Sequence, residues 1–425
     1  MRWLAYTIII LFSTFLGRVI INPFLAERSA ENLQKKDLEK AIRYSPNNAD
    51  YHYLFGRTLE SDLELLDLKS AIESYRRSLR LNPLDSRAWI ALARAYEGLG
   101  MEKEADQAIS KAIKTNPTDP RLRWEAGIFY LLRERIDRAF ENLKVYLLLE
   151  PGKQDLVYDL CERIKVERRY ILRDLIPPFY SYYKPYLSYL ISHRNLNDAR
   201  EVWKVISGMK EWIEKGLYLR YIDFLISLSE YNEARQVWTA FLKDFGLNNP
   251  ESEGNEILWN SGFERELTGG GFDWRLGKAE GVKIFIDNDV HREGLKSISM
   301  VFDGKHNPDL VAASQVTLLK PNTTYTLKGY IKTENLTTTN GIFIDITGHN
   351  QATGSCEKGL YKATDTVTGT NHWKEVQADF MTPPDCYAGI ISIKRQKSTK
   401  FDNKIGGNAW VDKITIKEGE RSYSR

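Results

Sequence analysis

Regularly spaced prolines are the feature that most limits how this chain can fold. Pro46, Pro83, Pro117 and Pro151 are separated by 37, 34 and 34 residues, and the first three lie in similar phrases, YSPNNAD, LNPLDSR and TNPTDPR. Self-similarity at a period near 34 residues is typical of a solenoid built from helical hairpins. Because proline lacks an N–H and crowds the preceding turn, each of these prolines is expected to follow the second helix of a hairpin.

The clearest unit runs from Trp89 to Pro117 and alternates large with small residues. Small Ala93 and Ala105 allow two helices to approach, and Trp89 fills the groove between them. This unit resembles the tetratricopeptide repeat. The resemblance implies an α-superhelix over residues 30–175, with protein partners bound on its concave surface.

A second, degenerate set of helical hairpins is expected over residues 176–245. The phrases NDAREVW (197–203) and NEARQVW (232–238) recur 35 residues apart, and each places Ala and Trp at the small and large positions of a helix. Between the two sets, the stretch IPPFYSYYKPYLSYL (176–190) interrupts the repeat pattern. Its tyrosines form either an exposed interaction patch or a buried hinge.

The chain changes character after a polar linker, GLNNPESEGNE (246–256). From residue 257 to 418, short runs alternate apolar with polar residues, among them SISMVFD, TYTLKGYIKT and YAGIISIK. Alternation with period two, with turn residues between the runs, predicts an all-β sandwich. The number of such runs suits a jelly roll.

Six phrases follow one another in this β region. They are ILWNSGFE, FDWRL, HREGLKSISMVFDG, LLKPNTTYTLKGYIKT, HWKEVQADFMTPPD and NAWVDKITI. Their order resembles that of the galactose-binding-like jelly-roll carbohydrate-binding modules attached to xylanases and glucanases. The resemblance covers about residues 257–416 and implies a glycan-binding domain, although domains of this fold also serve in protein assembly.

Sugar rings stack on aromatic side chains while their hydroxyls meet polar groups. Three aromatic residues of the β region are therefore candidate glycan contacts: Trp274, Tyr361 and Phe401. Tyr361 and Phe401 lie in segments expected to be long loops, where an aromatic ring is accessible to a ligand.

The resemblance also implies a structural calcium ion. Glu264 in the opening phrase and Asp412 in the closing phrase match the acids that help to hold this ion in the family, and calcium takes six to eight oxygen ligands. The family often has a second aspartate next, but here Lys413 follows Asp412, which removes one ligand. The alternative is that both acids only cap turns or pair with lysines.

Two of the three cysteines, Cys356 and Cys386, lie in the β region. Outside the cytoplasm they are expected to form a disulfide that closes a loop of about 30 residues. Cys161 is left over and is expected to be buried in a helix.

Residues 1–27 are expected to form a single transmembrane helix that anchors the chain. No charge occurs from Trp3 to Gly17, and the apolar character resumes after Arg18. A spanning helix needs about 20 mostly apolar residues. The alternative is a cleaved signal peptide, although the small residues that its cleavage site requires are missing. The bulk of the chain is then expected on the extracytoplasmic side, which is the periplasm in a bacterium.

Charge and motifs argue against several classes of function. The 60 Lys and Arg against 57 Asp and Glu leave a net charge of +3, whereas nucleic-acid binders usually show a clear basic excess. The motifs G-x-S-x-G, H-E-x-x-H and the P-loop are absent from the sequence. We therefore expect no enzymatic activity.

The sequence as a whole predicts a multidomain α + β protein: a transmembrane helix, a tetratricopeptide-like α-superhelix and an all-β jelly-roll sandwich. It favours a membrane-anchored extracytoplasmic adaptor that binds protein partners and glycan, in cell-surface polysaccharide assembly or export. Two alternatives stay open. One is a protein-assembly factor without sugar binding, and the other is a carbohydrate-active enzyme with an unrecognised site.

Overall fold

The structure, a computed structural model, describes residues 6, 11–61, 67–247, 257–349, 356, 359–401 and 403–419. The chain divides into two compact units, which are residues 1–189 with 201–206, and residues 190–200 with 207–425. Part of the expected anchor (1–5 and 7–10) and most of the expected linker (248–256) lie outside the described residues.

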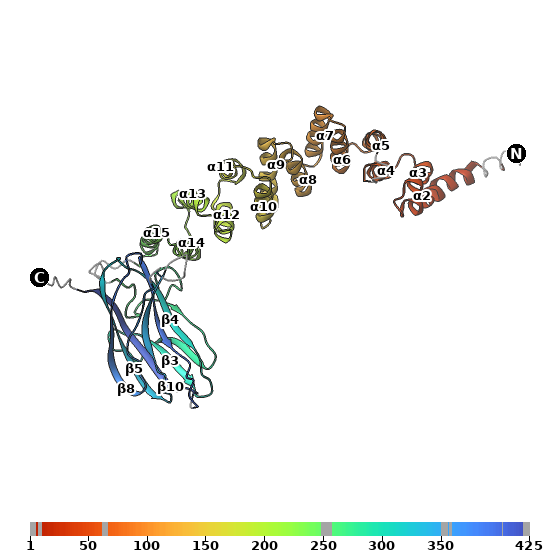
Figure 1. Ribbon diagram of the computed structural model, residues 1–425. Helices are drawn as coiled ribbons and strands as arrows, with labels where there is room; N and C mark the ends of the chain where they lie inside the picture. The colour runs from red at the N-terminus through yellow and green to blue at the C-terminus, as the bar shows by residue number, and fades with distance from the viewer. Residues whose placement is uncertain are drawn as a thin grey trace. The chain divides into compact units, whose positions relative to one another are not determined.

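The first unit is a succession of helices (Figure 1). In chain order these are the π-helix η1 (Gly17–Ile21), α2 (Asn22–Ala30), α3 (Lys35–Tyr44), α4 (Ala49–Ser61), α5 (Leu68–Leu81), α6 (Ser86–Gly98), α7 (Glu102–Thr115), α8 (Pro120–Leu131), α9 (Ile136–Leu149), α10 (Gln154–Arg163), α11 (Arg168–Tyr170), the π-helix η2 (Ile171–Leu175) and α12 (Tyr180–Ser192), whose last residues, 190–192, belong to the second unit. Helix α13 (Leu196–Gly208) belongs partly to each unit.

The predicted helical hairpins are confirmed in this unit. Helices α4 and α5, α6 and α7, and α8 and α9 pack against each other in pairs. At the small positions, Gly56 and Gly127 lie so close to the partner helix that a Cβ atom would meet Tyr75 or Leu143 at 2.6 Å. Tight helix contact therefore explains why small residues recur at this place in the repeat.

Aspartates start several of these helices. The side chains of Asp67, Asp85 and Asp119 accept backbone N–H groups in the first turns of α5, α6 and α8. Side-chain capping of this kind satisfies donors that have no partner inside the helix. Asp85 and Asp119 follow Pro83 and Pro117 by two residues, so each phrase ends one helix and starts the next.

The repeat pattern is interrupted between α10 and α12. The chain forms the π-helix η2 there, and Pro185 lies inside α12. Tyr183 is buried, which favours a buried hinge over an exposed patch for this tyrosine.

The structure bears on the expected anchor only in part. Among the residues that the structure describes, none of the helices reaches the length and apolar character that crossing a membrane requires.

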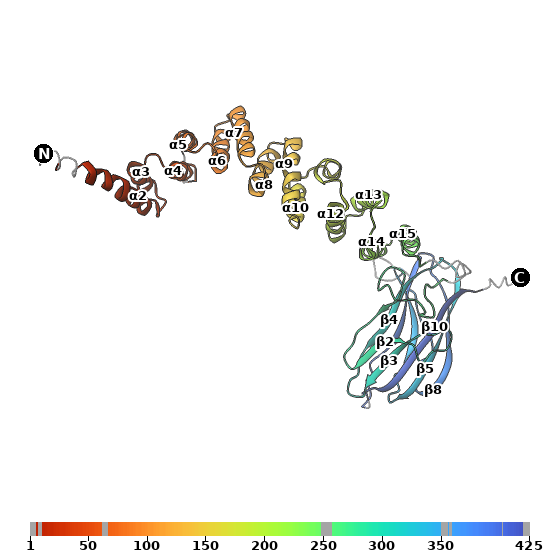
Figure 2. The ribbon, with the colours of Figure 1, turned by 180° about the vertical axis from the view of Figure 1, so that it is seen from behind.

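The second unit contains a helical hairpin and a β-sandwich (Figure 2). The hairpin consists of α14 (Lys215–Ser227) and α15 (Tyr231–Asp244). The strands are β1 (Arg275–Leu276), β2 (Val282–Asp287), β3 (Ser297–Asp303), β4 (Leu310–Leu318), β5 (Thr324–Leu336), β6 (Phe343–Gly348), β7 (Tyr361–Ala363), β8 (Gly369–Met381), β9 (Ala388–Arg395) and β10 (Gly406–Glu418).

Two antiparallel sheets form the sandwich. Sheet A has the strand order β1-β4-β9-β6-β7, and sheet B has the order β2-β3-β10-β5-β8. Apolar side chains from both sheets fill the core between them, including Ile344, Ile346 and Ile414. The predicted β sandwich is therefore confirmed.

The hairpin packs on the sandwich within this unit. The Trp238 ring of α15 lies 5.9 Å from the Trp259 ring and 6.1 Å from the Phe272 ring, both in edge-to-face contact. Asp223 of α14 accepts hydrogen bonds from the Gly271 N–H at 2.8 Å and from the Arg275 guanidinium at 2.5 Å. The last helical repeat is thus part of the same compact unit as the sandwich.

Candidate carbohydrate-binding site

The three aromatic residues that the sequence offers as glycan contacts differ in how accessible they are. Trp274 is fully buried, its ring lies 5.3 Å from that of Phe263, and its Nε1 donates to the Asn260 carbonyl at 3.1 Å. A ring without exposed surface is not available to stack on a sugar. The prediction for Trp274 is therefore wrong, because the opening segment of the domain folds over this residue.

Tyr361 and Phe401 are both exposed. Tyr361 lies on the edge strand β7 with 59 % of its surface exposed, and Phe401, after the end of β9, is fully exposed. Tyr361 projects from a regular sheet, whereas Phe401 projects from a loop. Among the described residues, no ring contact joins Tyr361 to Phe401.

The pairing of strands shows which face of sheet A carries Tyr361. On β6, the Ile344 side chain points into the core toward sheet B. A Cβ atom added to Gly329 of sheet B would lie only 2.4 Å from Ile344 Cδ1. Because side chains alternate along a strand, Phe343, Asp345 and Thr347 point away from sheet B. Tyr361 pairs with Thr347, so it lies on the same outward side.

We call this side the outer face of sheet A. Following the register across β4, β9, β6 and β7, it comprises Ser314, Val316, Phe343, Asp345, Thr347, Tyr361, Ile390, Ser392 and Lys394. The middle of this face is the most deeply enclosed part, since Phe343, Asp345 and Ser392 are all buried. The exposed Tyr361 ring borders an enclosed polar floor.

Asp345 and Lys394 form an ion pair on that floor. The Lys394 ammonium lies 2.8 Å from Asp345 Oδ2, and the Asp345 side chain has only 1 % of its surface exposed, against 27 % for Lys394. Burial raises the pKa of Asp345 above its ordinary value, and the Lys394 ammonium opposes this shift. Asp345 Oδ1 is buried and accepts no hydrogen bond from the residues that the structure describes.

This ion pair was missed by the sequence reasoning, although its signal is present. In the phrase FIDIT (343–347), isoleucines alternate with Phe, Asp and Thr. Alternation of this kind places a charged residue on one face of a strand whose other face is core. An aspartate at the centre of an apolar strand is a reason to look for a site.

The acids expected to hold calcium lie at one turn, 291–296. Glu264 oxygens accept backbone N–H groups of this turn at 3.0–3.2 Å, and Asp412 Oδ2 accepts two more at 2.8 and 3.1 Å. Gly294 in the turn has a φ of +67°, and a Cβ atom there would overlap the Glu264 carboxylate.

These contacts do not yet make a calcium site. Calcium requires an oxygen shell, whereas the donors around Glu264 and Asp412 are N–H groups. Over the described ranges, His, Cys, Asp and Glu side chains form no group of three or more that could hold a metal. Calcium at this turn stays a prediction, because an ion would have to exchange N–H groups for oxygen ligands.

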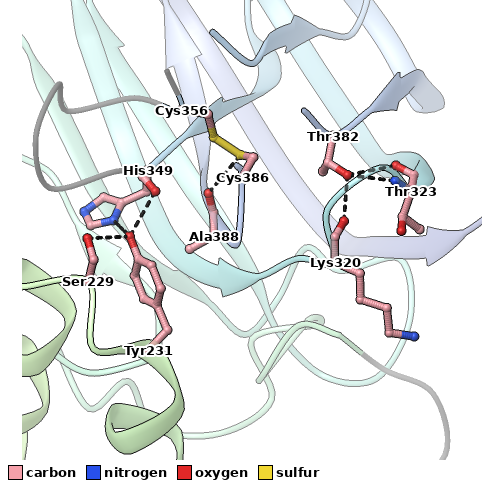
Figure 3. The surroundings of a disulfide bond; sticks show 9 residues. All are labelled: Ser229, Tyr231, Lys320, Thr323, His349, Cys356, Thr382, Cys386 and Ala388. Carbon is pink, nitrogen blue, oxygen red and sulfur yellow. Dashed lines mark hydrogen bonds between the residues drawn. A yellow bond between two sulfur atoms is a disulfide. The ribbon is translucent and has the colours of Figure 1, made fainter. Parts of the chain in front are cut away.

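The structure contains the disulfide Cys356–Cys386 (Figure 3). It joins the segment after β6 to the turn before β9. Cys161 is buried and free, and burial raises the pKa of its thiol to about 12. This thiol is therefore protonated at neutral pH and is not a reactive nucleophile.

Two family descriptions match this chain. Residues 63–123 match the tetratricopeptide repeat, and residues 255–400 match a carbohydrate binding domain. The chain thus carries tetratricopeptide repeats followed by a β domain that is similar to carbohydrate-binding domains.

Curated relatives match parts of the chain. The tRNA(Glu)-specific nuclease WapA of Bacillus subtilis subsp. natto is 29 % identical over 179 residues, which is 41 % of this chain. The Hsp70-Hsp90 organizing protein of Triticum aestivum is 28 % identical over 137 residues, or 32 % of this chain. The matches span only 7 % and 23 % of the length of these two relatives.

Solved structures resemble parts of this chain, and their TM-scores are low. MamA is 24 % identical with a TM-score of 0.25, and the match covers 28 % of this chain and 69 % of MamA. The CBM22-1 xylan-binding domain of Paenibacillus barcinonensis Xyn10C is 14 % identical with a TM-score of 0.24, covering 38 % of this chain and 93 % of that domain.

Proposed function

We propose that this chain is a non-enzymatic adaptor that joins a glycan to a protein partner at the extracytoplasmic surface of a membrane. In this proposal, residues 1–27 anchor the chain, the tetratricopeptide repeats bind protein, and the sandwich binds glycan. Cell-surface polysaccharide assembly or export is the process that such an adaptor suits. The two family matches support the division of labour between the repeats and the sandwich.

The outer face of sheet A is the observation that carries glycan binding. An exposed aromatic ring beside a polar floor offers the two kinds of contact that a sugar needs, because ring C–H groups stack on the aromatic face while hydroxyls form hydrogen bonds. Tyr361 supplies the ring. The hydroxyls of the half-buried Thr347 and Ser314 and the ammonium of Lys394 are the accessible polar groups on the same face.

Asp345 acts on this face mainly through Lys394. Its carboxylate holds the ammonium at 2.8 Å, and an ammonium group has three N–H donors. The remaining donors are therefore available to sugar oxygens. The face carries one positive and one negative charge, which suits a neutral glycan better than a highly charged one.

The repeats present polar groups that pair with one another between neighbouring hairpins. Arg94 of α6 lies 3.6 Å from Glu60 of α4 and 3.7 Å from Glu125 of α8. Arg87 likewise reaches Asp50 at 2.8 Å. These balanced charges favour a partner with mixed polar contacts over a strongly acidic or basic one.

The proposal is tested by probing an array of bacterial and plant polysaccharides with the detergent-solubilised full chain. Saturable binding to one class of polysaccharide is the expected result. An array without any bound glycan, with a chain shown to be folded, would contradict glycan binding and leave a protein-assembly factor. Release of sugar fragments from a bound polysaccharide would contradict the absence of enzymatic activity.

Calcium is tested in the same experiment by adding a chelator. A lower unfolding temperature or lost glycan binding in the chelator would support an ion at Glu264 and Asp412. Unchanged behaviour would show that the N–H groups of the turn alone satisfy these carboxylates.

A further inference from the structure

A large cleft lies where helix α15 meets the end of the sandwich, entirely within the second unit. Its volume is about 1600 Å³. Its lining includes residues of α15, of the opening segment 257–265, of the end of β4, of the turn before β9, of the turn 293–294 and of β10. We call it the end cleft. It is larger than the roughly 300–1,000 Å³ of most small-molecule sites, so a polymer suits it better than a small ligand.

The end cleft adjoins the outer face of sheet A at Val316. Val316 lines the cleft. Across neighbouring strands, Val316 pairs with Ile390, Ile390 pairs with Thr347, and Thr347 pairs with Tyr361. These four residues form one row across neighbouring strands. At a strand spacing of about 4.8 Å, the row brings the cleft within about 14 Å of Tyr361.

Helix α15 contributes exposed polar side chains to this cleft. Asn232 and Arg235 are exposed on α15 and line it, and Tyr387 lies in the lining with 58 % of its surface exposed. The Trp259 Nε1 donor is buried and has no hydrogen-bond partner in the described part of the chain. Five acidic and five basic side chains lie in the lining, so the lining as a whole does not attract a strongly charged polymer.

The structure holds α15 firmly over this end of the sandwich. Tyr231 Oη lies 2.6 Å from His349 Nδ1 and 2.9 Å from the His349 carbonyl oxygen (Figure 3). Burial lowers the pKa of His349 and so favours the neutral ring. In the tautomer with hydrogen on Nδ1, the ring donates to Tyr231 Oη while the Tyr231 hydroxyl donates to the His349 carbonyl oxygen. The Cys356–Cys386 disulfide restrains the same end of sheet A.

The turn on the other side of the cleft is also fixed. Thr382 Oγ1 donates to the Lys320 carbonyl at 2.6 Å and accepts the Thr323 N–H at 3.0 Å (Figure 3). Hydrogen bonds therefore hold α15 and the turn after β4, both of which contribute to the lining of the cleft. A preformed site loses less conformational freedom on binding.

We propose that helix α15 supplies an additional part of the glycan-binding surface. A neutral polysaccharide chain lies on the outer face of sheet A beside Tyr361 and continues into the end cleft, where Asn232 and Arg235 contact it. This inference rests on the proposed glycan binding. It makes the last helical repeat a sugar-binding element and specifies a long chain as the ligand.

The test compares full-chain variants on oligosaccharides of increasing length, taken from the polysaccharide that binds best. The double variant Asn232→Ala/Arg235→Ala removes the α15 contacts, and Gln236→Ala is the matched control, because Gln236 is exposed on the same helix but does not line the cleft. Tyr361→Ala tests the sheet face. All four of these side chains are exposed.

The double variant is expected to lose about tenfold in affinity for long chains, the effect of one lost hydrogen bond to a charged group. Its affinity for the shortest ligand that binds should be unchanged, whereas Tyr361→Ala should weaken both. If the double variant bound long chains as tightly as the unaltered chain does, the role of α15 would be overturned and glycan binding would stand. Absence of any glycan binding by the unaltered chain would overturn both proposals.

Discussion

Gly271 is the residue on which the contact between hairpin and sandwich most depends. It has a φ of +61°, and a Cβ atom there would lie 2.6 Å from the ring of Trp238. A left-handed backbone is costly for any residue with a Cβ atom, and overpacking adds to that cost. Glycine is therefore required by conformation and by space together.

Gly271→Ala should lower the free energy of unfolding of the second unit by about 2–4 kcal/mol. Gly269→Ala is the matched control, because Gly269 also has a positive φ, +74°, but a Cβ atom there would meet nothing within 4 Å. The control should cost only about 1–2 kcal/mol. Equal losses in denaturant unfolding would contradict a close approach of Trp238.

Asp412 is expected to make the stability of the second unit depend on pH. The residue is fully buried, and burial raises the pKa of its carboxyl above the ordinary value. The folded state therefore binds a proton more readily than the unfolded state, so this contribution to stability is complete below pH of about 4 and is lost as pH rises through the folded pKa.

Asp412→Asn should flatten the dependence of unfolding free energy on pH above about pH 4, where the unfolded carboxyl ionises. Urea unfolding at several pH values measures it. A variant with the same slope as the unaltered chain would show that Asp412 does not carry this titration.

At the scale of elements, the disulfide joins two turns of sheet A that lie beside the end cleft. It closes a loop with a sequence separation of 30 residues, which on the chain-entropy model stabilises the fold by about 3.6 kcal/mol. The same bond restrains the end of the sheet where His349 meets Tyr231. Loss of the disulfide should therefore destabilise the sandwich and weaken the contact between His349 and Tyr231 that holds α15.

A reducing agent should lower the unfolding temperature of the unaltered chain and leave that of Cys356→Ala/Cys386→Ala unchanged. Thermal unfolding followed by near-ultraviolet circular dichroism measures both. An unaltered chain that is insensitive to reduction, with its thiols shown to be free, would contradict a stabilising role for the bond.

The helices and strands could be predicted from the sequence because the patterns that indicate them are local. The proline spacing and the capping aspartates define the hairpins, and period-two alternation defines the strands. The candidate site was harder to predict, because alternation shows that a strand has two faces but not which face is covered. Trp274 resembled a ligand contact until the opening segment was found to cover it, and Asp345 was overlooked inside an apolar strand.

For the whole molecule, the boundary between compact units does not follow the change from helix to strand. The polar segment 246–256 suggested a linker between domains, yet α14 and α15 belong to the unit that contains the sandwich. Long-range contacts such as that of Trp238 with Trp259 decide this, and a sequence pattern does not reveal them.

A fragment of residues 190–425 should therefore unfold at a higher temperature than one of residues 250–425. The shorter fragment lacks α14 and α15 and exposes the Trp259 and Phe272 rings, whose burial against Trp238 is worth about 1–3 kcal/mol. Equal unfolding temperatures would show that the hairpin contributes nothing to the stability of the sandwich.

Glycan recognition by the outer face of sheet A is the central claim, and a calorimetric titration tests it most directly. The full chain, Tyr361→Ala and Phe285→Ala are each titrated with the polysaccharide that binds best. Phe285 is the control because its ring is exposed on β2 of sheet B. We predict about tenfold weaker binding for Tyr361→Ala, in line with a lost stacking contact, and unchanged binding for Phe285→Ala. Equal affinities of all three proteins would contradict the account.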